Sequence, residues 1–512
     1  MRYFQSSFGR KYCLSYPKNA KYIKIRFGEI VLHSKFVRSL SYLVLVSSLA
    51  VIFYFMFKDL NWILGNDELF LRTTMIGEPC HTWMGQGRLW SLGLFDYSIL
   101  LLLPKAIGQT IEAHFDYNII MIAVAIFSLY HFFNKVNEKN YGLSLFFVLI
   151  LLCSSSFAPI CMNCTYPERM MFLIQVLFMY FWLKGYQNNS MQFYFISWIF
   201  CTYLIFSKEP VSSAVLVVAL INLIFGWNQL TEKDRSFHFL QIFSTLIYFG
   251  IYIYRCFYSN NGESEENIFV FSQRLDALNT IFIDEPILGL VLIFAVIRAY
   301  FVFVKTDRRT LFIDSLLFGS VIYAIVGAMF SQIDFFNMFP SLIFAFPSLV
   351  FWTDYLWKEN KFTSILIVFL IGGTAYLAYD VSKNFAWNTY RLRNNDMEVV
   401  DFIADSYING KYIYFFTNGE TVSRFRIDAV HGNVRAFDIF THFVNYSLQK
   451  KNYLRDSNIL RPLEKLEYAF DDSVILCSTE MNQKYKDYLG SRGFKVLRRA
   501  YDIDVYAQQS YE

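Results

Sequence analysis

The sequence has little charge for its length. Only 17% of its 512 residues are Asp, Glu, Lys or Arg, whereas 55% are hydrophobic and 20% are aromatic. A soluble globular protein of this composition would be unusual, and apolar runs of about 18 residues or more are long enough to cross a bilayer. The composition therefore predicts a polytopic membrane protein, and the lipid bilayer is one of its expected partners.

Other absences narrow the function further. The net charge is only +4 and no strip of basic and aromatic residues occurs, so no nucleic-acid partner is expected. The eight cysteines are scattered, and Cys161 and Cys164 form the one close pair, with no histidine cluster near them. This pattern indicates neither a zinc site nor a disulfide framework.

The apolar runs predict eleven transmembrane helices within residues 38–380. Their approximate bounds are 38–58, 116–134, 143–161, 169–186, 192–207, 211–227, 237–256, 286–304, 311–330, 338–356 and 362–380. The first run is long enough to span and lacks a small-residue cleavage site after it, so we expect an anchor and not a signal peptide. The expected fold is an all-α membrane bundle.

Lysine and arginine set the orientation of this bundle. Residues 1–38 carry nine Lys or Arg and one Glu. By the positive-inside rule, the N-terminal segment 1–37 is therefore cytoplasmic. Alternation then places on the same side five short loops that each contain a basic residue: NKVNEKNYG, KGYQNNSMQ, NQLTEKDRSF, KTDRRT and WKENK.

The loops on the opposite side carry adjacent acids and bases. Residues 59–115 form the longest of them up to the second span, because the apolar run from Ile99 to Pro104 is too short to cross a membrane. The others lie at 162–171, 207–210, 260–286 and 331–337. The inner loops, in contrast, are mainly short and basic. This difference between the two faces predicts a functional site on the extracytoplasmic face.

After residue 380 the composition changes to that of a soluble domain. Residues 381–512 hold 18 Lys or Arg and 17 Asp or Glu, with no long apolar run. The segments 411–417 and 472–478 are typical of buried strands, and the segment from Asn482 to Gln508 is typical of a helix, a glycine turn and a hairpin. We expect a small extracytoplasmic α/β domain.

This layout resembles the GT-C class of membrane glycosyltransferases, and within it the bacterial glucosyltransferases of the GtrII-like type. The motifs that carry the resemblance are NDE (66–68), GQGRLW (85–90), YPERM (166–170) and KEP (208–210). The resemblance implies a multi-pass enzyme of the cell membrane. It would transfer a sugar from a polyprenyl-phosphate-linked donor to a cell-surface glycan acceptor on the extracytoplasmic side.

Such a transfer needs a base for the acceptor hydroxyl, and Asp67 or Glu68 is placed just beyond the first span. Many relatives have two aspartates there, so either carboxylate is a candidate. The same pair could also hold a divalent cation through its oxygens.

The departing phosphate needs a cation, and sugar rings favour aromatic neighbours. The candidate cations are Arg88, Arg169 and Lys208; Glu168 and Glu209 are candidates for holding a cation or contacting sugar hydroxyls; Trp90 and Tyr166 are candidates for stacking on the sugar.

Plainer interpretations exist for the same residues. Asp67 and Glu68 could cap a helix, Arg88 and Trp90 could anchor at the lipid headgroups, and Glu168 and Arg169 could form a local ion pair. Lys208, Glu209 and Pro210 could be an ordinary helix start. A transporter, flippase or polymerase of lipid-linked glycans is the alternative function, although transporters usually carry charges near the span centres.

Overall fold

The structure is a computed structural model that describes most of the chain. The described residues are 27–57, 83–85, 88–90, 99–100, 102–104, 111–162, 167–258, 279–280, 282–306, 310–329, 335–416, 444–445, 447–448, 451, 453, 459–463, 465–478, 481–500 and 503–508. The chain forms two compact units. The helical unit comprises Met1–Met56 and Leu71–Ala386, and the C-terminal unit comprises Phe57–Phe70 and Trp387–Glu512.

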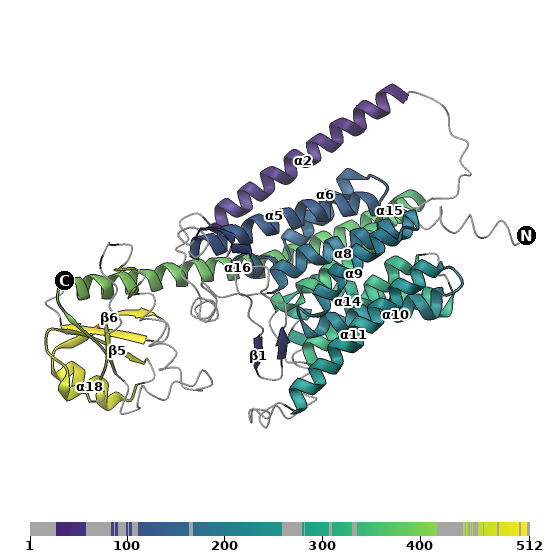
Figure 1. Ribbon diagram of the computed structural model, residues 1–512. Helices are drawn as coiled ribbons and strands as arrows, with labels where there is room; N and C mark the ends of the chain where they lie inside the picture. The colour runs from purple at the N-terminus through teal and green to yellow at the C-terminus, as the bar shows by residue number, and fades with distance from the viewer. Residues whose placement is uncertain are drawn as a thin grey trace, which may run out of the picture. The chain divides into compact units, whose positions relative to one another are not determined.

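The helical unit is a bundle of mostly antiparallel neighbours along the chain (Figure 1). Its helices are α2 (Phe27–Phe57), α5 (Ile111–Val136), α6 (Tyr141–Leu152), α7 (Phe157–Met162), α8 (Glu168–Asn188), α9 (Met191–Ile205), α10 (Glu209–Gly226), α11 (Glu232–Tyr258), α13 (Pro286–Ala299) with the π-helical turn η2 (Tyr300–Val304), α14 (Leu311–Met329), the 3-10 turn η3 (Phe335–Met338), α15 (Phe339–Glu359) and α16 (Lys361–Ile408). A short hairpin, β1 (Trp83–Gly85) and β2 (Arg88–Trp90), accompanies them.

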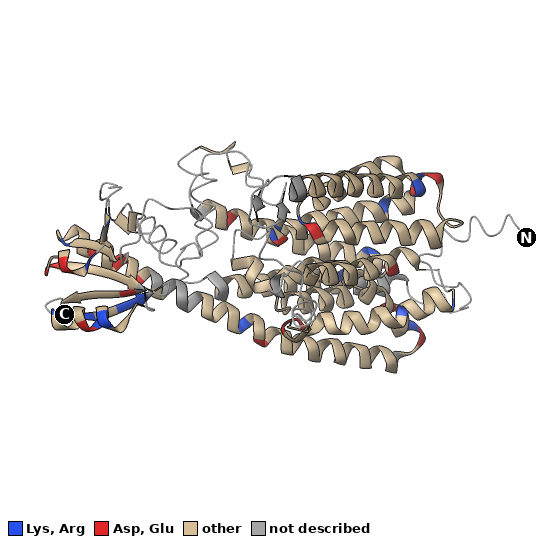
Figure 2. Cartoon of the chain, turned by 90° about the horizontal axis from the view of Figure 1, so that it is seen from below, with Lys and Arg blue, Asp and Glu red and all other residues tan. Residues whose placement is uncertain are grey.

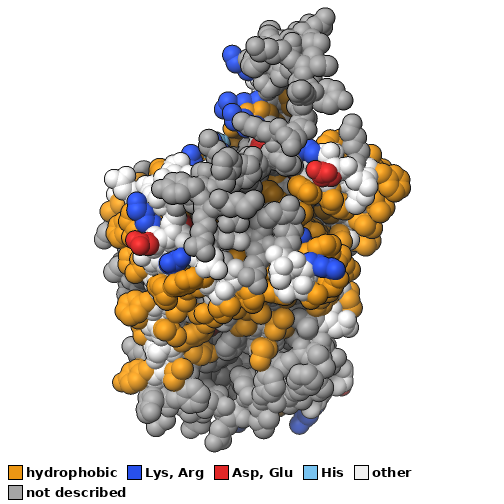
Figure 3. All heavy atoms as spheres, turned by 90° about the vertical axis from the view of Figure 1, so that its right-hand side faces the viewer, with side chains coloured by type: hydrophobic (Ala, Val, Ile, Leu, Met, Phe, Trp, Pro, Cys, Tyr) orange, Lys and Arg blue, Asp and Glu red, His pale blue; other side chains and the backbone are white. Residues whose placement is uncertain are grey.

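Eight helices in the described part of the chain are long and apolar enough to cross a membrane. They are α2, α5, α10, α11, α13 with η2, α14, α15 and the first part of α16. In the helical unit, Lys, Arg, Asp and Glu residues lie mainly near the helix ends (Figure 2), and hydrophobic side chains make up much of the described surface in the view of Figure 3. The chain is therefore a multi-pass membrane protein, as the composition predicts.

The other three predicted spans correspond to α6, α8 and α9, which are helical but are not both long and apolar enough to be counted as membrane-crossing helices. Helix α6 has 12 residues and α9 has 15, and the 21-residue α8 has polar residues at both ends and at Gln175. The count of eleven spans is thus reduced to eight candidates, although a helix overlaps each predicted range.

The predicted continuous span 143–161 is wrong, because the chain leaves the helix between α6 and α7 at residues 153–156. At this break the backbone N–H of Ser156 donates to the Glu285 carboxylate at 2.9 Å, so it does not bond to the carbonyl four residues earlier. The Ser155 hydroxyl donates instead to the carbonyl of Ala378. Tertiary contacts therefore end α6.

Helix α16 is longer than predicted. The last span was expected to end at residue 380, but the helix continues without a break to Ile408. Residues 381–394 contain neither proline nor glycine, so nothing in the sequence stops the helix. Helix α2 likewise begins at Phe27, upstream of the predicted residue 38.

The C-terminal unit contains a five-stranded sheet in the order β4-β3-β5-β7-β6. Its elements are β3 (Tyr412–Phe416), β4 (Leu460–Leu463), the 3-10 turn η5 (Leu466–Tyr468), β5 (Ser473–Ser478), α18 (Gln483–Ser491), β6 (Phe494–Ala500) and β7 (Ile503–Gln508). Strands β3, β4 and β5 are parallel, whereas β7 is antiparallel to β5 and β6. The predicted strands, helix and hairpin are confirmed.

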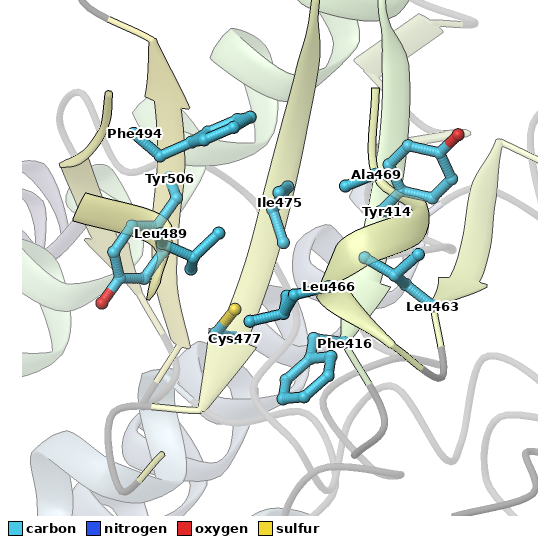
Figure 4. Close-up of a cluster of buried hydrophobic side chains, with 10 residues drawn as sticks. All are labelled: Tyr414, Phe416, Leu463, Leu466, Ala469, Ile475, Cys477, Leu489, Phe494 and Tyr506. Carbon is cyan, nitrogen blue, oxygen red and sulfur yellow. The ribbon is translucent and has the colours of Figure 1, made fainter. Parts of the chain in front are cut away.

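One face of this sheet packs against α18 and the segment around η5. The buried cluster consists of Tyr414, Phe416, Leu463, Leu466, Ala469, Ile475, Cys477, Leu489, Phe494 and Tyr506 (Figure 4). Helix α18 ends before Gly493, whose φ of +80° lies in the left-handed region that glycine adopts without strain. The turn lets β6 return along the sheet.

Candidate functional site

The starts of α8 and α10 and the turn η3 meet at one buried ion pair. Lys208, the residue before α10, is salt-bridged to Glu168, the first residue of α8. The same ammonium donates to the side-chain oxygen of Asn337 in η3, at 2.6 Å. Glu168 and Lys208 are fully buried and Asn337 is 8% exposed. We call Glu168, Lys208 and Asn337 the buried triad.

Local sequence explains why these residues begin helices. Pro167 precedes α8, and Pro210 occupies the first turn of α10, where its missing N–H costs no hydrogen bond. Glu168 and Glu209 lie in the first turns of their helices, where a carboxylate interacts favourably with the helix dipole. The interpretation of Lys208, Glu209 and Pro210 as a helix start is therefore correct, but it does not describe all their contacts.

Burial makes the pairing energetically necessary. An isolated ammonium or carboxylate taken out of water loses several kcal/mol of solvation, and a partner within hydrogen-bond distance compensates for this loss. Glu168 Oε1 and the Asn337 amide provide two partners for Lys208. The second carboxylate oxygen, Glu168 Oε2, is buried and has no hydrogen-bond partner among the described residues. The triad thus retains an acceptor that could receive a hydroxyl group.

Three further buried polar residues extend the triad. Arg169 is fully buried and its guanidinium lies 4.0 Å from the Met121 sulfur of α5. Glu209 is buried beside Lys208 in the sequence. The Tyr323 phenol of α14 is fully buried and lies near the carboxylates of Glu168 and Glu209. Two cations and two carboxylates therefore lie at or near this convergence of helix starts.

This arrangement can bind an anionic group. Helix N-termini present unbonded backbone N–H groups and a positive dipole end, and both attract phosphate. Lys208 and Arg169 add formal positive charge there. Glu168 and Glu209 can orient these cations or accept hydrogen bonds from hydroxyl groups.

The structure brings together Glu168 and Lys208, and Arg169 and Glu209 are next to them in the chain. It pairs Glu168 with Lys208 of another helix, 40 residues away, and not within a local Glu168–Arg169 unit. Arg88 and Trp90 form the ends of β2, which packs against α10. Asp67, Glu68 and Tyr166 lie outside the described residues.

Sequence reasoning misses Asn337, Tyr323 and Glu285. Asn337 falls in a predicted outer loop, but an amide carries no charge to single it out. Tyr323 lies inside a predicted span, where tyrosine is common. Glu285 has the pattern of an ordinary loop acid, yet it is fully buried and accepts hydrogen bonds from the N–H and the hydroxyl of Ser156, the latter at 2.6 Å.

Burial raises the pKa of Glu285 to about 7, and the hydrogen bonds from Ser156 oppose that rise. Glu285 lies one residue before the candidate span Pro286–Val304. Its carboxyl therefore titrates near neutrality.

No group of three His, Cys, Asp or Glu side chains that could hold a metal ion occurs among the described residues. The carboxylate pair that could hold a divalent ion, Asp67 and Glu68, lies outside the described residues.

Comparison with known proteins gives likenesses among solved structures but no match by sequence. No protein-family model matches the sequence, and a search of curated proteins found no match. Among solved structures, the chain is similar to the crystal structure of ArnT from Cupriavidus metallidurans bound to undecaprenyl phosphate. The TM-score is 0.44 and the identity 11%, over 91% of this chain and 97% of that chain.

Proposed function

We propose that this chain is an integral membrane glycosyltransferase of the GT-C class. It transfers a sugar from a polyprenyl-phosphate-linked donor to a cell-surface glycan on the extracytoplasmic side. The observation that supports this proposal best is the buried triad, in which Glu168 and Asn337 hold Lys208 where α8 and α10 begin beside η3.

The cations act on the leaving group. When the anomeric carbon–oxygen bond breaks, negative charge grows on the phosphate, which stays attached to the lipid. Lys208 and Arg169 at the helix starts, and Arg88 on β2, stabilise that charge. Because Lys208 is already oriented by two partners, it needs little reorganisation during the reaction.

The acceptor side needs a base. Asp67 or Glu68 takes the proton of the acceptor hydroxyl as its oxygen attacks the anomeric carbon. The sequence indicates no side chain as a covalent nucleophile. The proposed reaction is therefore a single displacement, which inverts the anomeric centre. Trp90 and Tyr166 stack on the sugar, and Glu168 and Glu209 accept hydrogen bonds from its hydroxyls. A divalent ion, where bound, would be held by the oxygens of Asp67 and Glu68.

The second candidate is a flippase or polymerase of lipid-linked glycans. Buried charged side chains within a membrane bundle also occur in transporters, and Arg298 with Asp314 forms another buried pair in this unit. Both carboxylate oxygens of Asp314 accept further hydrogen bonds, one from Thr310 and one from Trp352. The pair therefore fits a structural role better than a transport path.

Mass spectrometry of surface glycans tests the proposal. Cells lacking the gene should lose a hexose-sized branch from their surface glycan. The wild-type gene should restore it, and a gene with Lys208→Ala should not. A gene with Lys358→Ala is the matched control, because Lys358 is partly exposed near the other end of α15 and should restore the branch. Accumulation of intact lipid-linked repeat units would instead indicate a flippase or polymerase.

A further inference from the structure

The C-terminal unit has three neighbouring aromatic rings, two of which are partly exposed. Tyr412 and Tyr414 lie two residues apart on β3, so they share one face of the sheet. Their ring centroids are 6.2 Å apart with planes at 17°, and the Phe470 ring lies 4.9 Å from that of Tyr412. We call Tyr412, Tyr414 and Phe470 the aromatic platform.

Only one member of the platform belongs to the hydrophobic core. Tyr414 is 7% exposed and lies beside Ala469 in the buried cluster (Figure 4). Tyr412 is 40% exposed and Phe470 is 55% exposed. Large aromatic side chains left in water at the rim of a complete core are a common feature of binding surfaces.

The charges around the platform have both signs. The Arg461 guanidinium lies 4.8 Å from the centre of the Tyr412 ring. Asp471 and Asp472 follow Phe470 directly, and they are salt-bridged to Arg492 and Lys411. An anionic membrane surface attracts clusters of Lys and Arg without interleaved acids, so these carboxylates disfavour a lipid surface as the occupant.

A neutral glycan matches this chemistry. The C–H groups on the face of a pyranose ring pack against an aromatic face, while its hydroxyl groups bond to charged side chains at the rim. The planes of the Tyr412, Tyr414 and Phe470 rings differ by 17° to 38°, so the three rings are tilted alike. The paired Asp471 and Asp472 keep exposed oxygens that can accept from sugar hydroxyls.

We propose that the aromatic platform binds the glycan acceptor by stacking neutral pyranose rings of that chain on Tyr412 and Phe470. The identity of this glycan as the acceptor rests on the proposed function. Binding itself needs neither donor nor transfer, so the two proposals can fail separately.

The test is binding of neutral hexasaccharides to the full-length protein in lipid nanodiscs, without donor. The probes are maltohexaose, cellohexaose and mannohexaose, measured by saturation-transfer NMR and by titration. At least one should bind, and Phe470→Ala or Tyr412→Ala should weaken its Kd about tenfold, the loss of one good ring contact. Phe470→Tyr keeps an aromatic face and should bind like the wild type.

Two controls make the result specific. Tyr453→Ala removes a tyrosine that is 43% exposed and contacts the Tyr407 ring, so it should leave Kd unchanged. Lys208→Ala should abolish transfer but keep hexasaccharide binding, which separates the platform from the transfer site. Binding of none of the three probes, or a Phe470→Ala variant that binds like the wild type, would overturn the platform proposal.

The membrane surface is the competing occupant. A fluorophore attached at Glu467→Cys, in the exposed turn η5 before Phe470, reports contact with lipid. We expect no quenching by lipids that carry a nitroxide group. Strong quenching would overturn the glycan assignment in favour of the membrane surface.

Discussion

Lys208 and Glu168 form a fully buried salt bridge between the starts of α10 and α8, although 40 residues separate them in the sequence. Each residue has an oppositely charged neighbour next to it in the chain, Glu209 for Lys208 and Arg169 for Glu168. The fold nevertheless pairs them across two helices. The contact therefore fixes the two helix starts relative to each other and orients the ammonium group.

A double-substitution cycle separates the structural from the functional role of this pair. Lys208→Met or Glu168→Gln alone leaves one buried group without its charged partner, and we expect each to destabilise the protein, by about 3–5 kcal/mol where a full charge remains. The double variant should recover most of that stability but none of the transfer activity. The measurements are denaturant unfolding in detergent and sugar transfer in membranes. A double variant that transfers sugar at the wild-type rate would show that the pair is purely structural.

The acidic pair before β1 gives the second prediction. Asp67→Asn and Glu68→Gln keep size and much of the hydrogen bonding while removing charge, so expression and membrane insertion should be normal. At least one of them, and we favour Asp67, should lower the transfer rate about a hundredfold to ten-thousandfold through loss of the general base. The readout is the initial rate with a polyprenyl-phosphate-linked sugar. Normal rates in both variants would leave the pair as a helix cap or a solvated turn.

Glu285 predicts a pH dependence of stability. Its pKa is about 7 in the folded protein against 4.5 ordinarily, so the folded state binds more protons between these values. The contribution of Glu285 to the free energy of unfolding should therefore be most favourable below pH 4.5. It should then fall by up to about 3 kcal/mol as the pH rises to 7, and change little above that.

Glu285→Gln isolates this contribution. The glutamine keeps an acceptor for the N–H and hydroxyl of Ser156 but cannot ionise. Thermal unfolding in detergent at pH 5 and pH 8 should show a smaller difference for the variant than for the wild type. Equal differences would mean that Glu285 does not titrate in this range.

The orientation of the bundle gives the fourth prediction. Glu138→Cys, in the basic loop between α5 and α6, should be protected from an impermeant thiol reagent added outside the cell. Asp487→Cys, on α18 of the C-terminal unit, should be labelled. The wild-type chain gives the background from its own cysteines. The reverse pattern would invert the topology and move every proposed site residue to the cytoplasmic side.

The sequence alone determined the features that depend on neighbouring residues. Apolar runs specify helices because every backbone hydrogen bond in lipid must be made within the segment. The strands at 412–416 and 473–478 follow from short β-branched and aromatic runs, and Pro210 marks the start of α10. The sequence also indicated four charged residues on the predicted outer face, namely Glu168, Arg169, Lys208 and Glu209.

Only the tertiary structure decided which of these groups meet. The bond from Lys208 to Asn337 joins residues 129 positions apart, and that from Ser156 to Glu285 spans the same separation. Such contacts depend on how whole helices pack against one another, and a local sequence pattern does not predict that packing. The same packing takes the Ser156 N–H out of its helix and buries Glu285. Burial in a low-dielectric interior then turns an ordinary loop acid into a group that titrates near neutrality.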